Sequence, residues 1–133
     1  MTFNFEVFRK RSKPKSSVPT VTIQKRGTFS LNQQAFDALR GAEAVELLYD
    51  RHQKVIGMRP ANAETQYAYP VRRQANGATW LIAGLAFCEY YNIPLGNARR
   101  YVAELYDDGA MLTVDLKKDA IEVAGSRSKK SSQ

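Results

Sequence analysis

The sequence predicts an α+β fold, mostly antiparallel β with two short helices, in a β-barrel-like arrangement. Most apolar segments alternate with polar residues, which is the pattern of half-buried strands. Only two short stretches combine helical spacing with a helix start or stop signal. The order strand, turn, strand, helix, hairpin occurs twice along the chain. We therefore expect two copies of one structural unit.

Residue identities mark the same repeat, with a first unit at about 18–60 and a second at about 67–116. The first matches are Thr28, Ala35 and Phe36 with Thr79, Ala86 and Phe87. After six inserted residues, the matches are Val45, Leu48, Tyr49 and Asp50 with Val102, Leu105, Tyr106 and Asp107.

In the first unit, the expected strands are Val18–Lys25, Thr28–Leu31, Ala44–Tyr49 and Lys54–Met58. Asn32 is a good N-cap and Gly41 a typical stop, so we expect a helix running to about Arg40. The last two strands flank the polar turn 50–53 and form a hairpin. A connection is expected from Pro60 to Gln66.

The second unit has the same order with a longer first turn. Its expected strands are Tyr67–Arg73, Thr79–Ile82, Arg100–Tyr106 and Ala110–Leu116. Pro70 lacks an N–H donor and favours an edge position for the first of these strands. A helix is expected from about Gly84 to Tyr91. Asp108-Gly109 tolerates the positive φ that a tight hairpin turn requires.

Outside the two units, Thr2–Phe8 alternates like a strand and residues 9–17 form a basic, solvated loop. Ala120–Val123 is expected to add a short strand. We therefore expect one globular domain over 1–124 and a disordered basic tail at 125–133.

The net charge of +7 is carried by two arms and not by the body of the chain. The arm cations are Arg9, Lys10, Arg11, Lys13 and Lys15 in the loop 9–17, and Arg127, Lys129 and Lys130 in the tail. Without these eight, twelve basic residues remain against thirteen acidic ones. Such arms either aid solubility or bind polyanions, and the composition leaves both alternatives open.

The sequence offers little for catalysis or metal binding. His52 is the only histidine and lies in a polar turn, and Cys88 is the only cysteine, expected as a buried thiol. Asp107 and Asp108 are explained by turn chemistry more simply than as an acid–base pair. We expect no enzymatic activity, no cofactor and no metal. With no secretory signal and no apolar run of ~18 residues, we expect a cytoplasmic protein that does not enter a membrane.

A basic pair before a glycine turn, a short strand, a short helix and a hairpin follow one another from Val21 to Pro60. In this order the chain resembles the swapped-hairpin family of SpoVT-AbrB and MraZ transcription factors. A fainter likeness covers Val71 to Leu116, so the whole resembles a single-chain pseudo-dimer. The resemblance implies an interlaced β-barrel that binds DNA through basic residues near the glycine turn. The chain differs where Ile-Pro usually ends the short strand, having Leu31-Asn32 and Ile82-Ala83.

The resemblance points to Lys25 and Arg26 in the first unit and to Arg72 and Arg73 in the second. We expect these four side chains to share one face, while the arm cations add sequence-independent phosphate contacts. Tyrosines interleaved with cations are a second signal for nucleic acid, since rings stack on bases. These residues are Tyr67, Tyr69, Tyr90, Tyr91 and Tyr101, with Arg99 and Arg100. Core packing is the alternative for these rings and for Trp80.

We therefore expect a small non-enzymatic protein that binds nucleic acid, double-stranded DNA before RNA, and that acts in transcription regulation. The alternative is a protein interaction or assembly module, in which exposed strand edges pair with a partner or with a second copy. The near-neutral body favours that alternative. A third interpretation is an accessory subunit whose catalytic site is completed by another chain.

Overall fold

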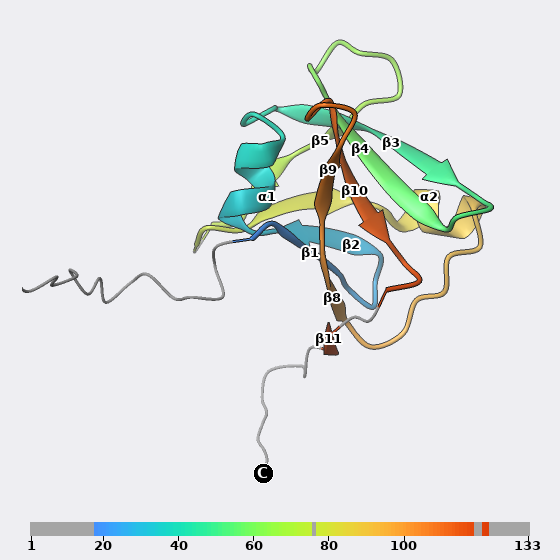
Figure 1. The fold of residues 1–133 in the computed structure, drawn as a ribbon. Coiled ribbons are helices and arrows are strands. Elements are labelled where there is room, and N and C mark those ends of the chain that lie inside the picture. Colours follow the sequence, from blue (N-terminus) through green and yellow to red (C-terminus); the bar gives the residue numbers. More distant parts are fainter. Residues whose placement is uncertain (1–17, 76, 119–120, 123–133) are drawn as a thin grey trace, which may run out of the picture.

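The computed structural model describes residues 18–75, 77–118 and 121–122, and its strands form two antiparallel sheets (Figure 1). Sheet A has the order β11 (Ile121–Glu122), β8 (Arg99–Val102), β1 (Thr20–Ile23), β2 (Thr28–Leu31), β7 (Trp80–Ala83), β6 (Arg72–Arg73). Sheet B has the order β5 (Tyr69–Pro70), β3 (Ala44–Asp50), β4 (Val55–Ala61), β10 (Met111–Asp115), β9 (Glu104–Tyr106). The helices are α1 (Gln33–Ala38) and α2 (Leu85–Tyr90).

The α+β class, with mostly antiparallel strands and two short helices, is thus confirmed. In the described residues each sheet remains open, because no ladder joins the edge strands of one sheet to those of the other. The strand expected at Thr2–Phe8, the loop 9–17 and the tail 125–133 lie outside the described residues.

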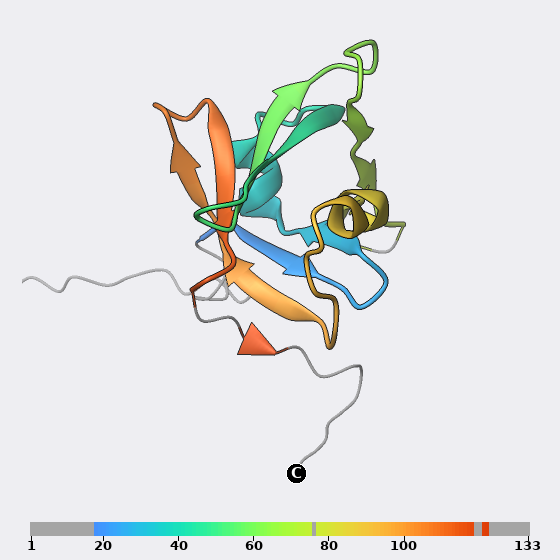
Figure 2. The ribbon, with the colours of Figure 1, turned by 90° about the vertical axis from the view of Figure 1, so that its right-hand side faces the viewer.

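The core lies between the sheets, because alternate residues of each strand point inward. The inward rows of sheet A are Val21–Leu31–Trp80 and Ile23–Phe29–Ile82, and those of sheet B are Leu47–Met58–Leu112 and Tyr49–Ile56–Val114. Most of these side chains belong to one buried hydrophobic cluster. Figure 2 shows the two sheets facing each other, as a core between them requires.

Two segments pass from one sheet to the other, and both were expected as single strands. The segment 67–73 contributes β5 to sheet B and β6 to sheet A, while Tyr67 has φ +68° and lies outside both strands. The segment 99–106 contributes β8 to sheet A and β9 to sheet B, with Ala103 buried at the crossing. Alternation of apolar and polar residues cannot reveal that a segment changes sheets, because the strand in each sheet alternates regularly by itself.

The hairpin strands differ from expectation mainly in length. β4 continues to Ala61, so Pro60 lies inside a strand opposite Val45 and not in a connection. A proline this close to a strand end removes only one ladder donor. β3 and β10 lie within a residue or two of the expected ranges.

Helix α1 begins where the sequence predicts. The Asn32 side-chain oxygen accepts a hydrogen bond from the Ala35 N–H at 2.9 Å, which caps the helix. The same oxygen accepts from the Thr20 N–H at 3.0 Å, so the cap also anchors the start of β1. Gly41 has φ +64° and its N–H donates to the Phe36 carbonyl, which ends the helix.

The two helices lie at opposite ends of the molecule (Figure 1). We call these the α1 end and the α2 end. At the α2 end the β1–β2 turn lies against the start of the helix, where the Gly84 N–H donates to the Gly27 carbonyl at 3.1 Å. At the α1 end Phe36 stacks on Trp80, with ring centroids 4.2 Å apart. The position of each cation at the α1 end or at the α2 end determines which cations lie close to one another.

Candidate nucleic-acid interface

The two basic pairs predicted from the sequence lie at different ends of the molecule. Lys25 and Arg26 are exposed in the β1–β2 turn at the α2 end. Arg72 and Arg73 are exposed in edge strand β6, and the Arg73 guanidinium lies 5.7 Å from the centre of the Trp80 ring at the α1 end. The expectation that the four share one face is therefore wrong, because strand pairing separates the pairs.

The turns themselves explain why the two pairs are not equivalent. The Gly27 N–H donates to the Gln24 carbonyl, and the Gln24 N–H donates to the Thr28 carbonyl. The second turn repeats this pattern, because the Gly77 N–H donates to the Gln74 carbonyl and the Gln74 N–H donates to the Thr79 carbonyl. In the first turn the basic pair lies between glutamine and glycine. In the second, those places hold Ala75 and Asn76, and the arginines belong to the preceding strand.

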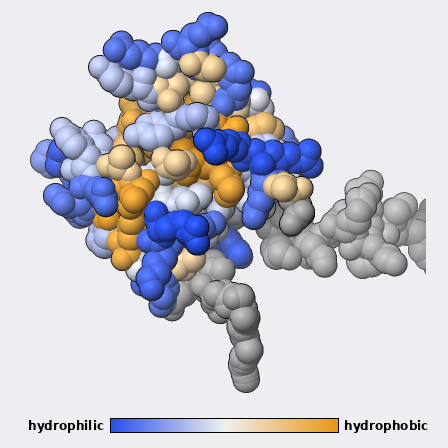
Figure 3. Space-filling view, turned by 180° about the vertical axis from the view of Figure 1, so that it is seen from behind, coloured by the Kyte–Doolittle hydropathy of each residue, from blue (hydrophilic) through white to orange (hydrophobic). Residues whose placement is uncertain are grey.

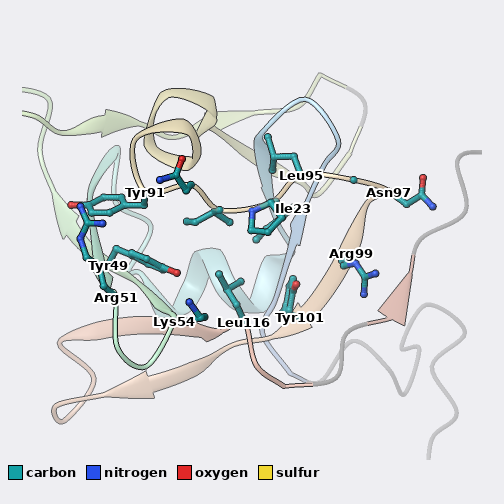
Figure 4. Close-up of a pocket in the computed structure, with 14 residues that line it drawn as sticks. Ile23, Tyr49, Arg51, Lys54, Tyr91, Leu95, Asn97, Arg99, Tyr101 and Leu116 are labelled. Carbon is teal, nitrogen blue, oxygen red and sulfur yellow. The ribbon is translucent and has the colours of Figure 1, made fainter.

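A hollow of about 660 Å³ opens at the α2 end and is shown in Figure 4. We call it the cationic pocket. It lies between the β3–β4 turn, the segment 91–98 and the ends of β1 and β8. Among the described residues, its lining contains three cations, three tyrosines and no carboxylate. These are Arg51, Lys54, Arg99, Tyr49, Tyr91 and Tyr101.

The cations lie on both sides of the pocket. Figure 4 shows Arg51 and Lys54 on one side and Arg99 on the opposite rim, with its guanidinium directed away from the centre. Within the described part of the chain, none of the three forms an ion pair with a carboxylate. Lys25 and Arg26 follow the lining residue Ile23 closely in the chain and belong to the same end.

The hairpin turn sets the positions of Arg51 and Lys54. The Asp50 carboxylate accepts hydrogen bonds from the N–H groups of His52 and Gln53, both at 2.9 Å, and so folds the turn. Lys54 closes the turn with φ +58°. Asp50 thus serves the local turn, as the sequence predicts.

Aromatic rings form the wall next to Arg51. Its guanidinium lies 4.8 Å from the Tyr91 ring centre, close enough for a cation–π contact. Tyr91 in turn packs on Tyr49 at 4.9 Å and on Phe87 at 5.0 Å. Phe87 continues this cluster to Phe29 in sheet A. The wall is therefore rigidly supported by the core.

Tyr101 forms part of the opposite wall. Burial raises its pKa above the ordinary value of 10.0, and Arg99 opposes this rise more weakly. The phenol is therefore neutral at physiological pH and can donate a hydrogen bond to an anion.

The segment after α2 supplies most of the remaining lining. Six consecutive residues from Asn92 to Asn97 line the pocket. Asn92 has φ +56° and turns the chain away from the helix. The repeat in the sequence needs six inserted residues at this place. The insertion thus coincides with a wall of the cationic pocket.

Sequence reasoning found this site in part. The interleaving of Tyr91, Arg99 and Tyr101 had indicated nucleic acid, and the structure brings these three together. The sequence predicts Arg51 only as a residue of the polar turn 50–53 and Lys54 only as the first residue of the strand Lys54–Met58. Their signal was the absence of acids from positions 51–54, immediately after Asp50. The arm cations lie outside the described residues.

The residues singled out for other chemistry have structural roles. Cys88 is fully buried, and burial, with a smaller contribution from Glu89, raises its thiol pKa to about 11. His52 is exposed in its turn. Asp107 and Asp108 both have positive φ in the β9–β10 turn. Within the described ranges, no group of three or more His, Cys, Asp or Glu side chains is arranged to hold a metal ion.

Hydrophobic and hydrophilic areas alternate on the face of the molecule seen from behind (Figure 3). No helix in the described part of the chain is both long and apolar enough to cross a membrane. No protein-family model, curated protein or solved structure matches this chain, so no relative indicates the ligand.

Proposed function

We propose that the chain is a non-enzymatic nucleic-acid-binding protein whose α2 end contacts the sugar–phosphate backbone. The observation that carries this proposal is the cationic pocket, in which Arg51, Lys54 and Arg99 line one hollow and no other described lining residue is charged. Phosphates are the anions best matched to several cations at one concave surface, because each charge neutralised releases a counterion. The tyrosines of the wall add stacking partners for bases.

Ion pairing elsewhere supports this interpretation. Arg59 lies 2.8 Å from Glu46, Lys117 lies 2.9 Å from Asp115, and Lys118 lies 3.1 Å from Glu104. These cations belong to sheet B or to the segment that follows it. Among the described side chains, no carboxylate forms an ion pair with Arg51, Lys54 or Arg99, and the backbone of Arg99 lies opposite that of Glu122 in β11.

We further infer that the fold is a duplicated unit in a barrel-like arrangement, as the resemblance to the swapped-hairpin family implies. When the segments 67–73 and 99–106 are each treated as one strand, exchange of the two units turns every observed pairing except β11–β8 into itself or into another observed pairing. Thus β1–β2 corresponds to β6–β7, β3–β4 to β9–β10, and β1–β8 to β5–β3, while β2–β7 and β4–β10 join the units. The repeated hydrogen bonds of the Gly27 and Gly77 turns also favour duplication.

The helices are aligned less well than the strands. Ala35 in α1 is fully buried, whereas Ala86, its match by residue identity in α2, is exposed. The alignment of the two helices by burial is therefore shifted by one residue from their alignment by identity. The segments 67–73 and 99–106 favour the barrel-like arrangement, because each links an outer strand of sheet B to sheet A through the chain itself.

A titration by fluorescence anisotropy tests the function. Labelled duplex DNA and labelled single-stranded DNA are each titrated at about 50 and about 200 mM salt. We expect binding that weakens steeply with salt, because three phosphate contacts in the pocket contribute about −2 to −3 to the log–log slope and contacts of the arm cations make it steeper. Dissociation constants weaker than ~100 μM for both ligands would contradict the proposal.

A variant without the arm charges distinguishes binding by the body from binding by the arms. All eight arm cations are replaced by serine in the full chain, which removes the arm charge without truncation. We expect a shallower salt slope but retained binding, because the pocket cations are unchanged. Complete loss of binding in this variant would assign the activity to the arms alone.

The choice of duplex DNA, the role in transcription regulation and the cytoplasmic location remain predictions from the sequence. One observation favours the alternative of a protein interaction module. Edge strand β9 exposes Leu105 at 54% and Tyr106 at 62% of their surfaces. An exposed edge with apolar side chains can pair with another strand. This alternative predicts no affinity for either nucleic acid in the titration.

A further inference from the structure

Two tyrosines near the cationic pocket are much more exposed than core packing explains. Tyr67 is 82% exposed and Tyr90 is 71% exposed. Tyr67 has φ +68° in the segment before β5, and Tyr90 is the last residue of α2. The sequence alternative that these rings belong to the core is therefore wrong for both.

Both tyrosines line a second hollow of about 390 Å³ between α2 and the segment before β5. We call it the tyrosine groove. Its lining residues are Leu47, Tyr67, Ala68, Tyr69, Ala86, Phe87, Tyr90 and Tyr91. None of them is charged, and four are tyrosines.

The tyrosine groove borders the cationic pocket, because Tyr91 lines both hollows. Arg51 marks the same junction, with its guanidinium 4.8 Å from the Tyr91 ring centre and 6.0 Å from the Tyr90 ring centre. Tyr90 and Tyr91 meet edge to face at 4.8 Å. A ligand that extends from one hollow to the other thus passes from cations to exposed aromatic rings.

We propose that the ligand is a single-stranded nucleic acid, whose phosphates contact the cationic pocket and whose unpaired bases stack on Tyr67 and Tyr90. This inference rests on the proposed function and specifies its ligand. Bases in a duplex are stacked on each other, so their faces are not available to protein rings. Unpaired bases expose both faces, and stacking on aromatic side chains accepts any base.

The test compares Tyr67→Ala/Tyr90→Ala with the wild-type full chain. The ligands are a labelled oligothymidylate of about 12 nucleotides and a blunt duplex of equal length, titrated by anisotropy. We expect the double variant to bind the oligothymidylate about 30-fold or more weakly, since each stacked base contributes substantially. The wild type should bind the duplex more weakly than the oligothymidylate. The affinity of the double variant for the duplex should differ from that of the wild type by less than about twofold, because the phosphate contacts are unchanged.

Two controls show whether ring stacking is responsible. Tyr67→Phe/Tyr90→Phe keeps both rings and should bind like the wild type. Tyr106→Ala removes a tyrosine of similar exposure, 62%, from edge strand β9, and should also bind like the wild type. Thermal unfolding by circular dichroism checks that the alanine variant is folded, as the exposure of both side chains leads us to expect.

The outcomes separate the two proposals. If the wild type binds neither ligand, the proposed function itself fails. If the oligothymidylate binds and Arg51→Ala/Lys54→Ala/Arg99→Ala weakens it while Tyr67→Ala/Tyr90→Ala does not, the function stands and the stacking inference is overturned. Tighter wild-type binding of the duplex would also overturn it and would return the ligand to the double-stranded DNA predicted from the sequence.

Discussion

The two ends of the molecule contain the same kinds of element but differ in what lies between helix and hairpin. At the α1 end only residues 39–43 join the helix to β3, and the Arg40 Nη2 donates to the Gly109 carbonyl of the opposite turn at 3.1 Å. At the α2 end residues 91–98 join the helix to β8, and the cationic pocket lies between helix and hairpin. A longer connection thus accompanies an open end, and a short one a closed end.

The hairpin turns at the two ends also differ in charge, and the more positive turn lies at the end with the cationic pocket. The turn at the α2 end has Arg51 and Lys54 beside Asp50, a net charge of +1, whereas the turn at the α1 end has Asp107 and Asp108, a net charge of −2. A polyanion is attracted to the first and repelled by the second. The comparison shows that the two ends differ in both loop length and turn charge, and these two differences are the reason why we place the proposed binding site at the α2 end.

The largest expected effect is on stability, and it distinguishes the turn at Gly27 from the turn at Gly77. A Cβ on Gly27 would lie 2.7 Å from the Leu85 Cα, and Gly27 has φ +92°. We expect Gly27→Ala to lower the free energy of unfolding by about 2–5 kcal/mol, from backbone strain and overpacking together. A Cβ on Gly77 meets nothing within 4 Å, so Gly77→Ala should change stability by less than about 0.5 kcal/mol.

Urea unfolding of both variants, followed by circular dichroism, measures this difference. Equal losses would show that the α2 end does not depend on the close approach of its turn to the helix.

The next effect concerns the charges of the α2 end. We expect Arg51→Ala/Lys54→Ala/Arg99→Ala to weaken binding of single-stranded DNA about 30-fold and to reduce the magnitude of the salt slope by about 2. The matched control is Arg59→Ala/Lys117→Ala/Lys118→Ala, which removes the same charge from cations already paired with carboxylates. Its affinity should change by less than about threefold.

Anisotropy at two salt concentrations measures both variants. Equal weakening by the two triple variants would show that net charge, and not the cationic pocket, governs binding.

The smallest effect lies at the α1 end. Arg40→Ala removes the hydrogen bond to Gly109, and an exposed bond of this kind contributes about 0.5–1 kcal/mol. Nucleic-acid affinity should stay unchanged, because Arg40 is remote from the cationic pocket. Urea unfolding and the same titration measure the two quantities. A loss of affinity would place part of the interface at the α1 end and weaken the contrast between the ends.

The local elements followed from the sequence wherever neighbouring residues decide them. The Asn32 cap, the stop at Gly41 and the positive φ of Asp108 and Gly109 each depend on residues within a turn of one another. Arg51 and Lys54 escaped attention as binding residues because a polar turn has the same composition whether or not a ligand binds there.

What the sequence determined by itself was the order of strands, turns and helices, because alternation and capping act over a few residues. Only the tertiary structure decided which sheet each strand joins, and therefore that the segments 67–73 and 99–106 each serve both sheets. It also decided that Lys25 and Arg26 lie at one end and Arg72 and Arg73 at the other. The physical reason is that strand pairing joins residues far apart in the chain, and no local pattern specifies the partner.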